Sequence, residues 1–364
     1  MMRALLCDRF GPAEDVRVAD IPAPAVLDPA VLDPAALAPA ALDPHAVVIA
    51  VEYASVSHAT GLMVAGRYQT RPPLPFVPGT EAVGRVVARG SAVTRLRPGD
   101  RVVAIADWGC FAEQVCLPEY TVYPIPDAVD TLRALPVPLS YGTAYCGLVW
   151  RCAVQPGETV LVLGAGAGVG LAAVEIAREL GAQVIACAST EAKREEALRR
   201  GAAHALAPED LAAAVKRVTG GRGADVVVDP VGGDLFDQSL RAAAANARLL
   251  SVGFASGRIP QAPLNLLLVK NLTLHGFFVG RYIGWTPANE RAQHAPALQA
   301  VMQTLLAWAS AGKIRPTVSK VYPMTGLAEA LHALEARQVV GKVAIKIQET
   351  EPCTTTPAAG PQPG

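Results

Sequence analysis

The chain has 364 residues, which is enough for about two domains and therefore for a cleft between them. Lys and Arg number 32 and Asp and Glu also number 32, and this neutral balance argues against nucleic acid or an acidic membrane surface as a partner. The seven cysteines are scattered with no CxxC pair, so the sequence indicates neither a disulfide framework nor a structural zinc lobe.

The start of the chain carries charges, at Asp8 and Arg9, where a signal peptide would be apolar. The longest uncharged apolar run, residues 159–174, is laced with glycine and too short to span a bilayer. We therefore expect a cytoplasmic protein that binds a small molecule, with no membrane and no nucleic acid among its partners.

Residues 25–44 form a tandem five-residue repeat, AVLDP AVLDP AALAP AALDP, in which every unit ends in proline. A proline at each fifth position removes helix donors and is excluded from central strands, so we expect a low-complexity surface insertion. A docking arm for a partner is the alternative. Residues 350–364 are expected to form a mobile tail.

The segments after the repeat are short, apolar and separated by turn residues. Residues 45–56, 81–90 and 100–106 alternate or run apolar between Gly, Pro and Asp. This pattern predicts a partly antiparallel, β-rich domain.

From Glu158 onward the pattern changes to strand, glycine turn and helix. Apolar strands are predicted at 159–164, 182–188, 224–230 and 247–254, and amphipathic helices at 168–180 and 191–201. Continuous Val, Leu and Ile runs that alternate with helices predict a parallel sheet covered on both faces, and so an α/β fold class.

The turn after the first of these strands reads Gly-Ala-Gly-Ala-Gly-Val-Gly over residues 164–170. Glycines let the backbone approach a pyrophosphate closely, and the N-terminus of the next helix supplies free N–H groups and partial positive charge. The turn is one residue longer than GxGxxG, but its place between strand and helix indicates a nucleotide site. The candidate cofactor residues here are Gly164, Ala167, Gly168, Val169 and Gly170.

The end of the second strand bears on the choice of cofactor. An NAD site usually places Asp or Glu there for the ribose 2′-hydroxyl, whereas this chain has Ser189, followed by Lys193 and Arg194. A hydroxyl and a cation suit a 2′-phosphate, so Ser189 and Lys193 predict NADPH as the cofactor. The alternative is that Lys193 and Arg194 only decorate a solvated helix face.

Several segments occur together in the order of one known family: PPLPFVPGTEAVGRV, LSYGTAYCGL, QPGETVLVLGAGAGVGLAAVEIA, GADVVVDPVGG, VKNLTLHGFFVGRY and GKVAIKI. On these segments the chain resembles the zinc-independent quinone oxidoreductases of the medium-chain dehydrogenase/reductase superfamily, the group that includes zeta-crystallin. The resemblance runs from Met2 to about Ile347, and the longer glycine turn is the form that this group tends to have.

The resemblance implies a GroES-like catalytic domain into which a Rossmann domain is inserted. The expected divisions are 1–135 for the catalytic domain, 136–281 for the Rossmann NADPH-binding domain, 282–349 for the return to the catalytic domain and 350–364 for the tail. It also implies a homodimer or a tetramer formed through the edge of the Rossmann sheet, and we expect the homodimer. The further cofactor residues that it implies are Gly253, Phe254, Phe278, Val279 and Lys342.

Zinc-dependent relatives hold their ion with Cys and His at two positions where this chain has Ser57 and Thr80. Hydroxyls do not provide the thiolate and imidazole set that zinc selects, so we expect no catalytic metal. His58 remains beside Ser57, but a lone histidine is more often a packed or hydrogen-bonded residue than a ligand.

The resemblance implies a cleft in which Tyr68 and Thr143 take the positions of a cleft tyrosine and a nicotinamide-side hydroxyl, and Ser57 joins them as a catalytic candidate. Either Tyr68 or solvent would give the proton; Tyr68 as a core aromatic is the alternative. Ser57 and Thr60 stand where the family commonly has Asn and Asp, so the family's quinone specificity does not carry over intact.

The sequence therefore predicts an NADPH-dependent reductase of quinones or related α,β-unsaturated carbonyls, in which the nicotinamide supplies the hydride without a metal. One alternative is an enoyl-thioester reductase. The other is a non-catalytic NADPH-binding structural or regulatory protein, for which the zero net charge argues against RNA as the partner.

Overall fold

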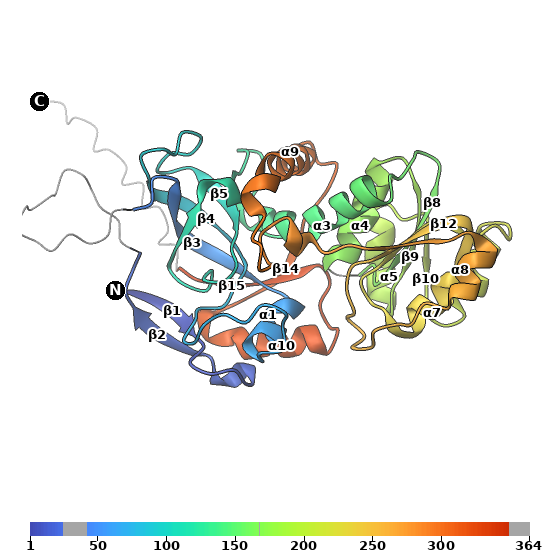
Figure 1. The fold of residues 1–364 in the computed structure, drawn as a ribbon, viewed down its shortest axis with the longest axis horizontal. Helices are drawn as coiled ribbons and strands as arrows, with labels where there is room; N and C mark the ends of the chain where they lie inside the picture. The colour runs from blue at the N-terminus through green and yellow to red at the C-terminus, as the bar shows by residue number, and fades with distance from the viewer. Residues whose placement is uncertain (25–41, 167, 349–364) are drawn as a thin grey trace, which may run out of the picture.

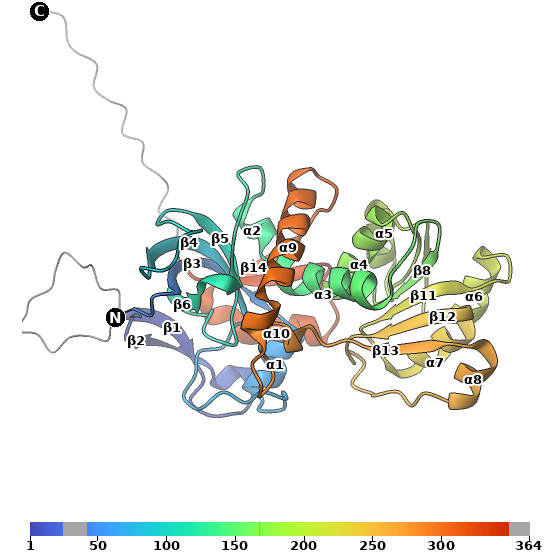
Figure 2. The ribbon, with the colours of Figure 1, turned by 45° about the horizontal axis from the view of Figure 1, so that its top comes forward.

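The computed structural model describes residues 1–24, 42–166 and 168–348. The predicted insertion lies outside these residues except for 42–44, and Ala167 and the predicted tail lie outside them as well. Within the described residues, two large sheets lie at opposite ends of the molecule, with helices α3 (Gly142–Cys146) and α9 (Arg291–Ser310) between them (Figures 1 and 2).

The first sheet is mainly antiparallel, as predicted. Its order in the described chain is β14-β15-β3-β4-β5-β7, and β6 also pairs with β3. The strands are β3 (Ala46–Val56), β4 (Glu81–Arg89), β5 (Arg101–Ile105), β6 (Gln114–Pro118), β7 (Val122–Pro124), β14 (Val318–Tyr322) and β15 (Lys342–Lys346), and a separate antiparallel pair is formed by β1 (Met2–Leu6) and β2 (Arg17–Ile21). This is the sheet of the GroES-like domain.

The second sheet is parallel, which confirms the α/β fold class. Its order in the described chain is β10-β9-β8-β11-β12-β13. The strands are β8 (Thr159–Leu163), β9 (Gln183–Cys187), β10 (His204–Leu206), β11 (Ala224–Asp229), β12 (Ala243–Ser251) and β13 (Thr273–Gly276). Sequence periodicity alone gave no indication of β10 or β13, which are only three and four residues long.

Alternating residues of β8 show why helices cover both faces of this sheet. Val160 and Val162 pack in the same apolar cluster as Ile176 of helix α4 (Gly168–Glu179), whereas Leu161 and Leu163 pack in a second cluster on the opposite face. The remaining helices are α1 (His58–Val64), α2 (Thr131–Ala134), α4 (Gly168–Glu179), α5 (Glu191–Arg199), α6 (Leu211–Val218), α7 (Gly233–Ala242), α8 (Leu264–Lys270) and α10 (Leu327–Glu335).

The chain leaves the first sheet before β8 and returns to it only at β14, so one sheet is nested within the sequence of the other. The larger apolar core is shared: Val83 and Val103 of the first sheet pack in one cluster with Val160 of the second and Leu305 of α9. The residue numbers at which the predicted domains begin and end stay a prediction.

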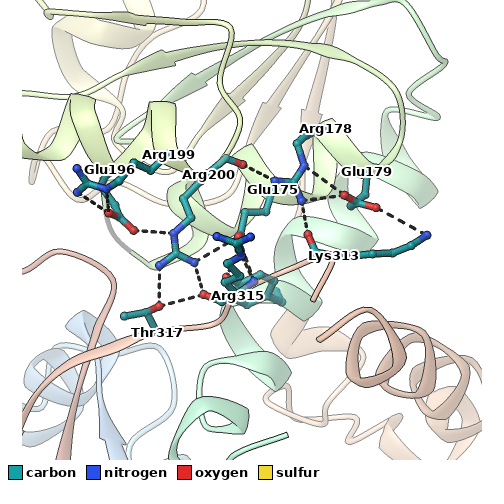
Figure 3. A network of polar contacts seen from close by, with 10 residues as sticks. Glu175, Arg178, Glu179, Glu196, Arg199, Arg200, Lys313, Arg315 and Thr317 are labelled. Carbon is teal, nitrogen blue, oxygen red and sulfur yellow. Dashed lines mark hydrogen bonds and ion pairs between the residues drawn. The ribbon is translucent and has the colours of Figure 1, made fainter. Parts of the chain in front are cut away.

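A buried carboxylate ties the returning segment to the parallel-sheet half (Figure 3). Glu175 of α4 is fully buried and accepts hydrogen bonds from the Tyr141 hydroxyl (2.5 Å) and from the backbone N–H of Arg315 (3.0 Å). Arg200 forms an ion pair with Glu175 (3.3 Å) and donates to Thr317 Oγ1 (2.6 Å). Burial, and then the Glu175 charge, raises the pKa of the Tyr141 hydroxyl well above its ordinary value, so Tyr141 is the donor.

Among the described residues, no helix combines the length and the apolar character needed to cross a membrane.

Candidate active site

The glycine turn follows β8 and leads into α4. Gly164 and Gly168 have φ angles of 62° and 49°, which side-chain-bearing residues rarely adopt. A Cβ on Gly170 would lie 2.1 Å from the Gly164 carbonyl oxygen, so only glycine permits this close approach of helix to turn. Val169 is half-buried against the shared core. The turn thus forms a cradle of backbone N–H groups at the N-terminus of a 12-residue helix.

Lys193 lies across this turn and is not a solvated surface residue. Its exposed fraction is 8%, and a Cβ on Gly166 would lie 2.6 Å from its side-chain methylenes. Its ammonium donates to the carbonyl oxygen of Arg337 (2.5 Å). Burial, and then the charge of Arg337, lowers the pKa of the ammonium. The solvated-face alternative is therefore wrong for Lys193.

The residues around Lys193 have defined local roles. Thr190 is the N-cap of α5 and accepts a hydrogen bond from the backbone N–H of Lys193 (3.4 Å). Arg194 donates to the carbonyl oxygen of Ala188 (3.0 Å), and Ser189 is exposed at the end of β9. The Ser189 hydroxyl therefore precedes the Thr190 N-cap in the chain, and the Lys193 ammonium follows it.

The other candidate cofactor residues follow two neighbouring parallel strands. Gly253 and Phe254 come after β12, and Phe278 and Val279 after β13, so they lie at the same edge of the sheet as the glycine turn. Phe254 and Phe278 are 42% and 37% exposed, whereas Val279 is buried. In open α/β sheets this carboxyl edge is where ligands bind.

Lys342 has a different surrounding from the one expected of a cofactor ligand. Its ammonium is buried and forms an ion pair with Glu81 of β4. Lys342 lines a small hollow together with Gly168 and Gly341, and it is near the glycine turn for this reason. The Lys342 ammonium is therefore engaged by a carboxylate of the protein, which differs from what a cofactor ligand would need.

The hydroxyl of Ser57 is used by the chain itself. Ser57 is the N-cap of α1: its Oγ accepts from the backbone N–H of Thr60 (3.3 Å), and Thr60 Oγ1 accepts from the backbone N–H of Ser57 (3.2 Å). This reciprocal capping box satisfies two backbone donors. Ser57 and Thr60, which stand where the family commonly has Asn and Asp, are thus engaged in capping α1.

Tyr68 is half-buried and its ring meets that of Trp285 edge to face, with centroids 6.2 Å apart. Burial raises the pKa of the Tyr68 hydroxyl to about 12, so it holds its proton at neutral pH. Thr143 is 7% exposed and belongs to α3, the helix that lies between the two sheets (Figure 1). The structure places Tyr68 after α1, on the catalytic-domain side, and Thr143 on α3, at the junction.

Four buried side-chain polar atoms lack a hydrogen-bond partner among the described residues: Thr80 Oγ1, Asp229 Oδ2, Trp285 Nε1 and Thr286 Oγ1. Trp285 is held against Tyr68, and Thr80 occupies the position of a metal-binding histidine in zinc-dependent relatives. Unpaired buried groups of this kind are rare in proteins. Sequence reasoning identified Thr80 only as a missing ligand and did not find Trp285 or Thr286, since no motif marks them.

Sequence reasoning also missed the loop of residues 337–341. Gly341 lies next to the glycine turn: Gly168 N–H donates to its carbonyl oxygen (3.2 Å), and its own N–H donates to the carbonyl oxygen of Gly166 (3.1 Å). In the described part of the chain, no group of three or more His, Cys, Asp or Glu side chains is placed to hold a metal ion.

Comparison with known proteins agrees with this geometry. Residues 43–127 match the family model described as alcohol dehydrogenase GroES-like domain, and residues 168–294 match the model described as zinc-binding dehydrogenase. A rat protein named quinone oxidoreductase-like protein 2 is 35% identical over 83% of this chain and 85% of its own length.

Two further relatives extend over more of the chain. Human quinone oxidoreductase is 28% identical over 91% of this chain and 93% of its own length. The crystal structure of Escherichia coli quinone oxidoreductase complexed with NADPH is 25% identical, covers 95% of this chain and 99% of its own, and superposes with a TM-score of 0.79. The chain thus belongs to the quinone oxidoreductase-like family of the medium-chain dehydrogenase/reductase superfamily, and is an oxidoreductase with a nicotinamide dinucleotide cofactor.

Proposed function

We propose that this protein is an NADPH-dependent reductase of quinones or related α,β-unsaturated carbonyls, and that it works without a catalytic metal. The observation that carries the proposal is the position of Lys193. This lysine follows β9 in the chain, and its side chain is buried against the glycine turn that follows β8. The residues that follow β9, Ala188 to Thr190, include no carboxylate for a ribose 2′-hydroxyl. The NADPH complex of the Escherichia coli relative supports the same cofactor.

The residues present fit a dinucleotide. At Gly170 the missing Cβ lets the helix approach the Gly164 carbonyl, and at Gly166 it lets the Lys193 side chain lie against the turn, so the backbone N–H groups of the turn and the Lys193 cation come together as a pyrophosphate would need. Ser189 and Lys193 would hold the 2′-phosphate, while Phe254, Phe278 and Val279 would border the nicotinamide together with Gly253. Ala167 lies outside the described residues, and its contribution stays a prediction. The Lys342 ammonium is paired with Glu81, so Lys342 would contact the cofactor only through its backbone.

A bound reduced nicotinamide would supply the hydride. The chain's own part is to orient the acceptor and to provide a proton. Thr143, buried on α3, would hold the nicotinamide side of the cleft, and Tyr68 would give its proton to the oxygen that gains charge. Ser57 would contribute only the part of its hydroxyl that the α1 cap leaves free.

We also propose that the protein is a homodimer formed through the edge of the parallel sheet. β13 is the last strand of that sheet, and α8 beside it exposes Leu264, Leu268 and Val269 by 75%, 76% and 71%. An open strand edge next to exposed apolar side chains is a surface that a second copy can cover.

The test of the proposed function is a screen of NADPH oxidation across quinones, enals and enoyl thioesters. We expect turnover with quinones or enals, well under one zinc per chain, and a rate that a chelator does not change. Turnover confined to enoyl thioesters would instead identify an enoyl-thioester reductase. Dinucleotide binding without turnover on any acceptor would identify a binding protein, and zinc lost together with activity would overturn the metal-free proposal.

The cofactor preference is tested by Lys193→Ala. A charge-assisted contact to phosphate contributes roughly 1.5–3 kcal/mol, so the Michaelis constant for NADPH should rise about tenfold to a hundredfold while that for NADH stays almost unchanged. Lys216→Ala, which removes an exposed lysine from α6, is the control. Equal use of both cofactors by the wild type, or equal weakening of both by the substitution, contradicts the assignment.

The role of Tyr68 is tested by Tyr68→Phe. Loss of a positioned general acid should lower kcat about tenfold or more without changing the affinity for NADPH. Because the pKa of Tyr68 is raised to about 12, the wild-type donor stays protonated from pH 6 to 9, so its titration should not shape the kcat profile over that range. An unchanged kcat would assign the proton to solvent.

The dimer is tested by light scattering on the intact chain. The wild type should have about twice the mass of the 37.8 kDa chain, and Leu268→Glu should yield a monomer because it buries a charge in the apolar contact. Leu198→Glu changes an exposed leucine on α5, outside this surface, and should stay dimeric. A monomeric wild type would disprove the proposal.

A further inference from the structure

The segment that follows β13, residues 277–286, runs from the proposed nicotinamide site to the proposed proton donor. Its first part includes Val279–Arg281, which contacts α3, the helix that carries Thr143. Its last part brings the ring of Trp285 edge to face with the ring of Tyr68, with centroids 6.2 Å apart. An acceptor that takes a hydride from the nicotinamide and a proton from Tyr68 therefore lies beside this segment.

Polar contacts hold the segment in place. The backbone N–H of Trp285 donates to the carbonyl oxygen of Gly280 (2.7 Å). Arg291, which is 5% exposed, donates to the carbonyl oxygen of Ile283 (2.5 Å) and forms an ion pair with Asp107 of the catalytic domain. The chain on either side of Trp285 is thus fixed, and its ring has a defined position before a ligand arrives.

The indole N–H of Trp285 has no hydrogen-bond acceptor among the described residues, although the side chain is only 7% exposed. Thr80 and Thr286 also have a buried hydroxyl without a partner, but a hydroxyl rotates and can either donate or accept, whereas an indole nitrogen only donates. The unpaired oxygen of Asp229 lies in the parallel sheet, and the other oxygen of that carboxylate already accepts two backbone N–H groups. Of the four, the Trp285 N–H is the group that most needs an acceptor from a ligand.

We propose that the Trp285 N–H is a catalytic donor that binds the carbonyl oxygen of the acceptor, beside the hydrogen bond from the Tyr68 hydroxyl. This inference rests on the proposed function and deepens it, since it concerns the acceptor of the same reaction. A quinone or enone that takes up the hydride and its two electrons places the negative charge on its carbonyl oxygen. Trp285 stabilises that charge and keeps its proton, whereas Tyr68 transfers its proton to the oxygen and regains one from solvent.

The edge-to-face pair of rings decides which acceptors suit the site. The Trp285 N–H is shielded from water in this structure, so the acceptor meets it by entering between the rings of Trp285 and Tyr68. Such a ring pair contributes little beyond the area that it buries, so a flat conjugated molecule can replace it. The site therefore selects flat acceptors that carry a carbonyl oxygen over flat molecules that carry none.

The kinetic test is Trp285→Phe, which keeps an aromatic ring against Tyr68 and removes the donor. Loss of one donor to a developing oxyanion lowers kcat strongly, so we expect kcat with duroquinone or an enal to fall about tenfold to a hundredfold, with the dissociation constant for NADPH unchanged. Trp308→Phe is the matched control, because Trp308 of α9 forms an edge-to-face pair with a different tyrosine, Tyr145 (5.8 Å), and it should keep the wild-type kcat. An unchanged kcat in Trp285→Phe overturns the proposal.

A second measurement separates a donor from a ring that is merely structural. The chain has four tryptophans, so isotopic labelling of the indole nitrogens gives four N–H signals in a nuclear magnetic resonance spectrum of the intact protein. Trp285→Phe identifies the signal of Trp285, and substitution of the other three tryptophans identifies it by exclusion if that variant does not fold.

The ligands for this measurement are a matched pair. In the complex with NADP⁺, which has no hydride to give, duroquinone should move the Trp285 signal downfield. Durene, which has the same methylated ring without the oxygens, should not. Equal shifts with both ligands would mean that the Tyr68 ring is the only acceptor of this N–H, and they would disprove the proposal.

The proposed function and this inference fail in different ways. A wild type that turns over no quinone, enal or enoyl thioester refutes the function, and this inference with it. A wild type that reduces these acceptors, but whose Trp285 signal does not respond to duroquinone, refutes the role of Trp285 alone.

Discussion

The buried carboxylate of Glu81 fixes the relation between the two halves of the molecule. It accepts hydrogen bonds from the Ser55 hydroxyl (2.5 Å) and from the backbone N–H of Leu139 (2.9 Å), and it forms an ion pair with Lys342. Removing one partner from a buried ion pair costs about 3–5 kcal/mol, because the other charge is left without compensation. The strands β3, β4 and β15 and the segment that leads into α3 therefore have one compatible arrangement around this charge.

Glu175 of α4 is a second buried carboxylate that joins the two halves, on the side of the parallel sheet. It binds Tyr141, in the segment that leads into α3, and Arg315, in the crossover to β14. Both connections between the sheets thus pass a buried carboxylate. Since Gly341 directly precedes Lys342, the same anchoring that joins the sheets also brings residues 337–341 to the glycine turn.

The site divides its chemistry between the two halves. The carboxyl edge of the parallel sheet presents backbone N–H groups and Lys193, which suit anions, whereas the catalytic half presents Tyr68 with a proton that burial keeps in place. Thr80 and Trp285 have buried polar atoms without partners in the described chain on that same half. Another such atom, Asp229 Oδ2, lies at the end of β11 in the parallel sheet, and burying polar atoms without partners is costly in every case.

The sequence by itself determined the parallel sheet, the antiparallel domain and the glycine turn. Apolar periodicity and glycine spacing are local properties, so they can be read without knowing which distant residues come into contact. It also identified Lys193, but not that the lysine is buried against Gly166. Only the tertiary structure decided that Lys342 pairs with Glu81 and that residues 337–341 meet the turn. The Glu81–Lys342 ion pair and the Lys193–Arg337 hydrogen bond join residues more than 140 positions apart, and no local sequence pattern shows which distant groups a folded chain brings together.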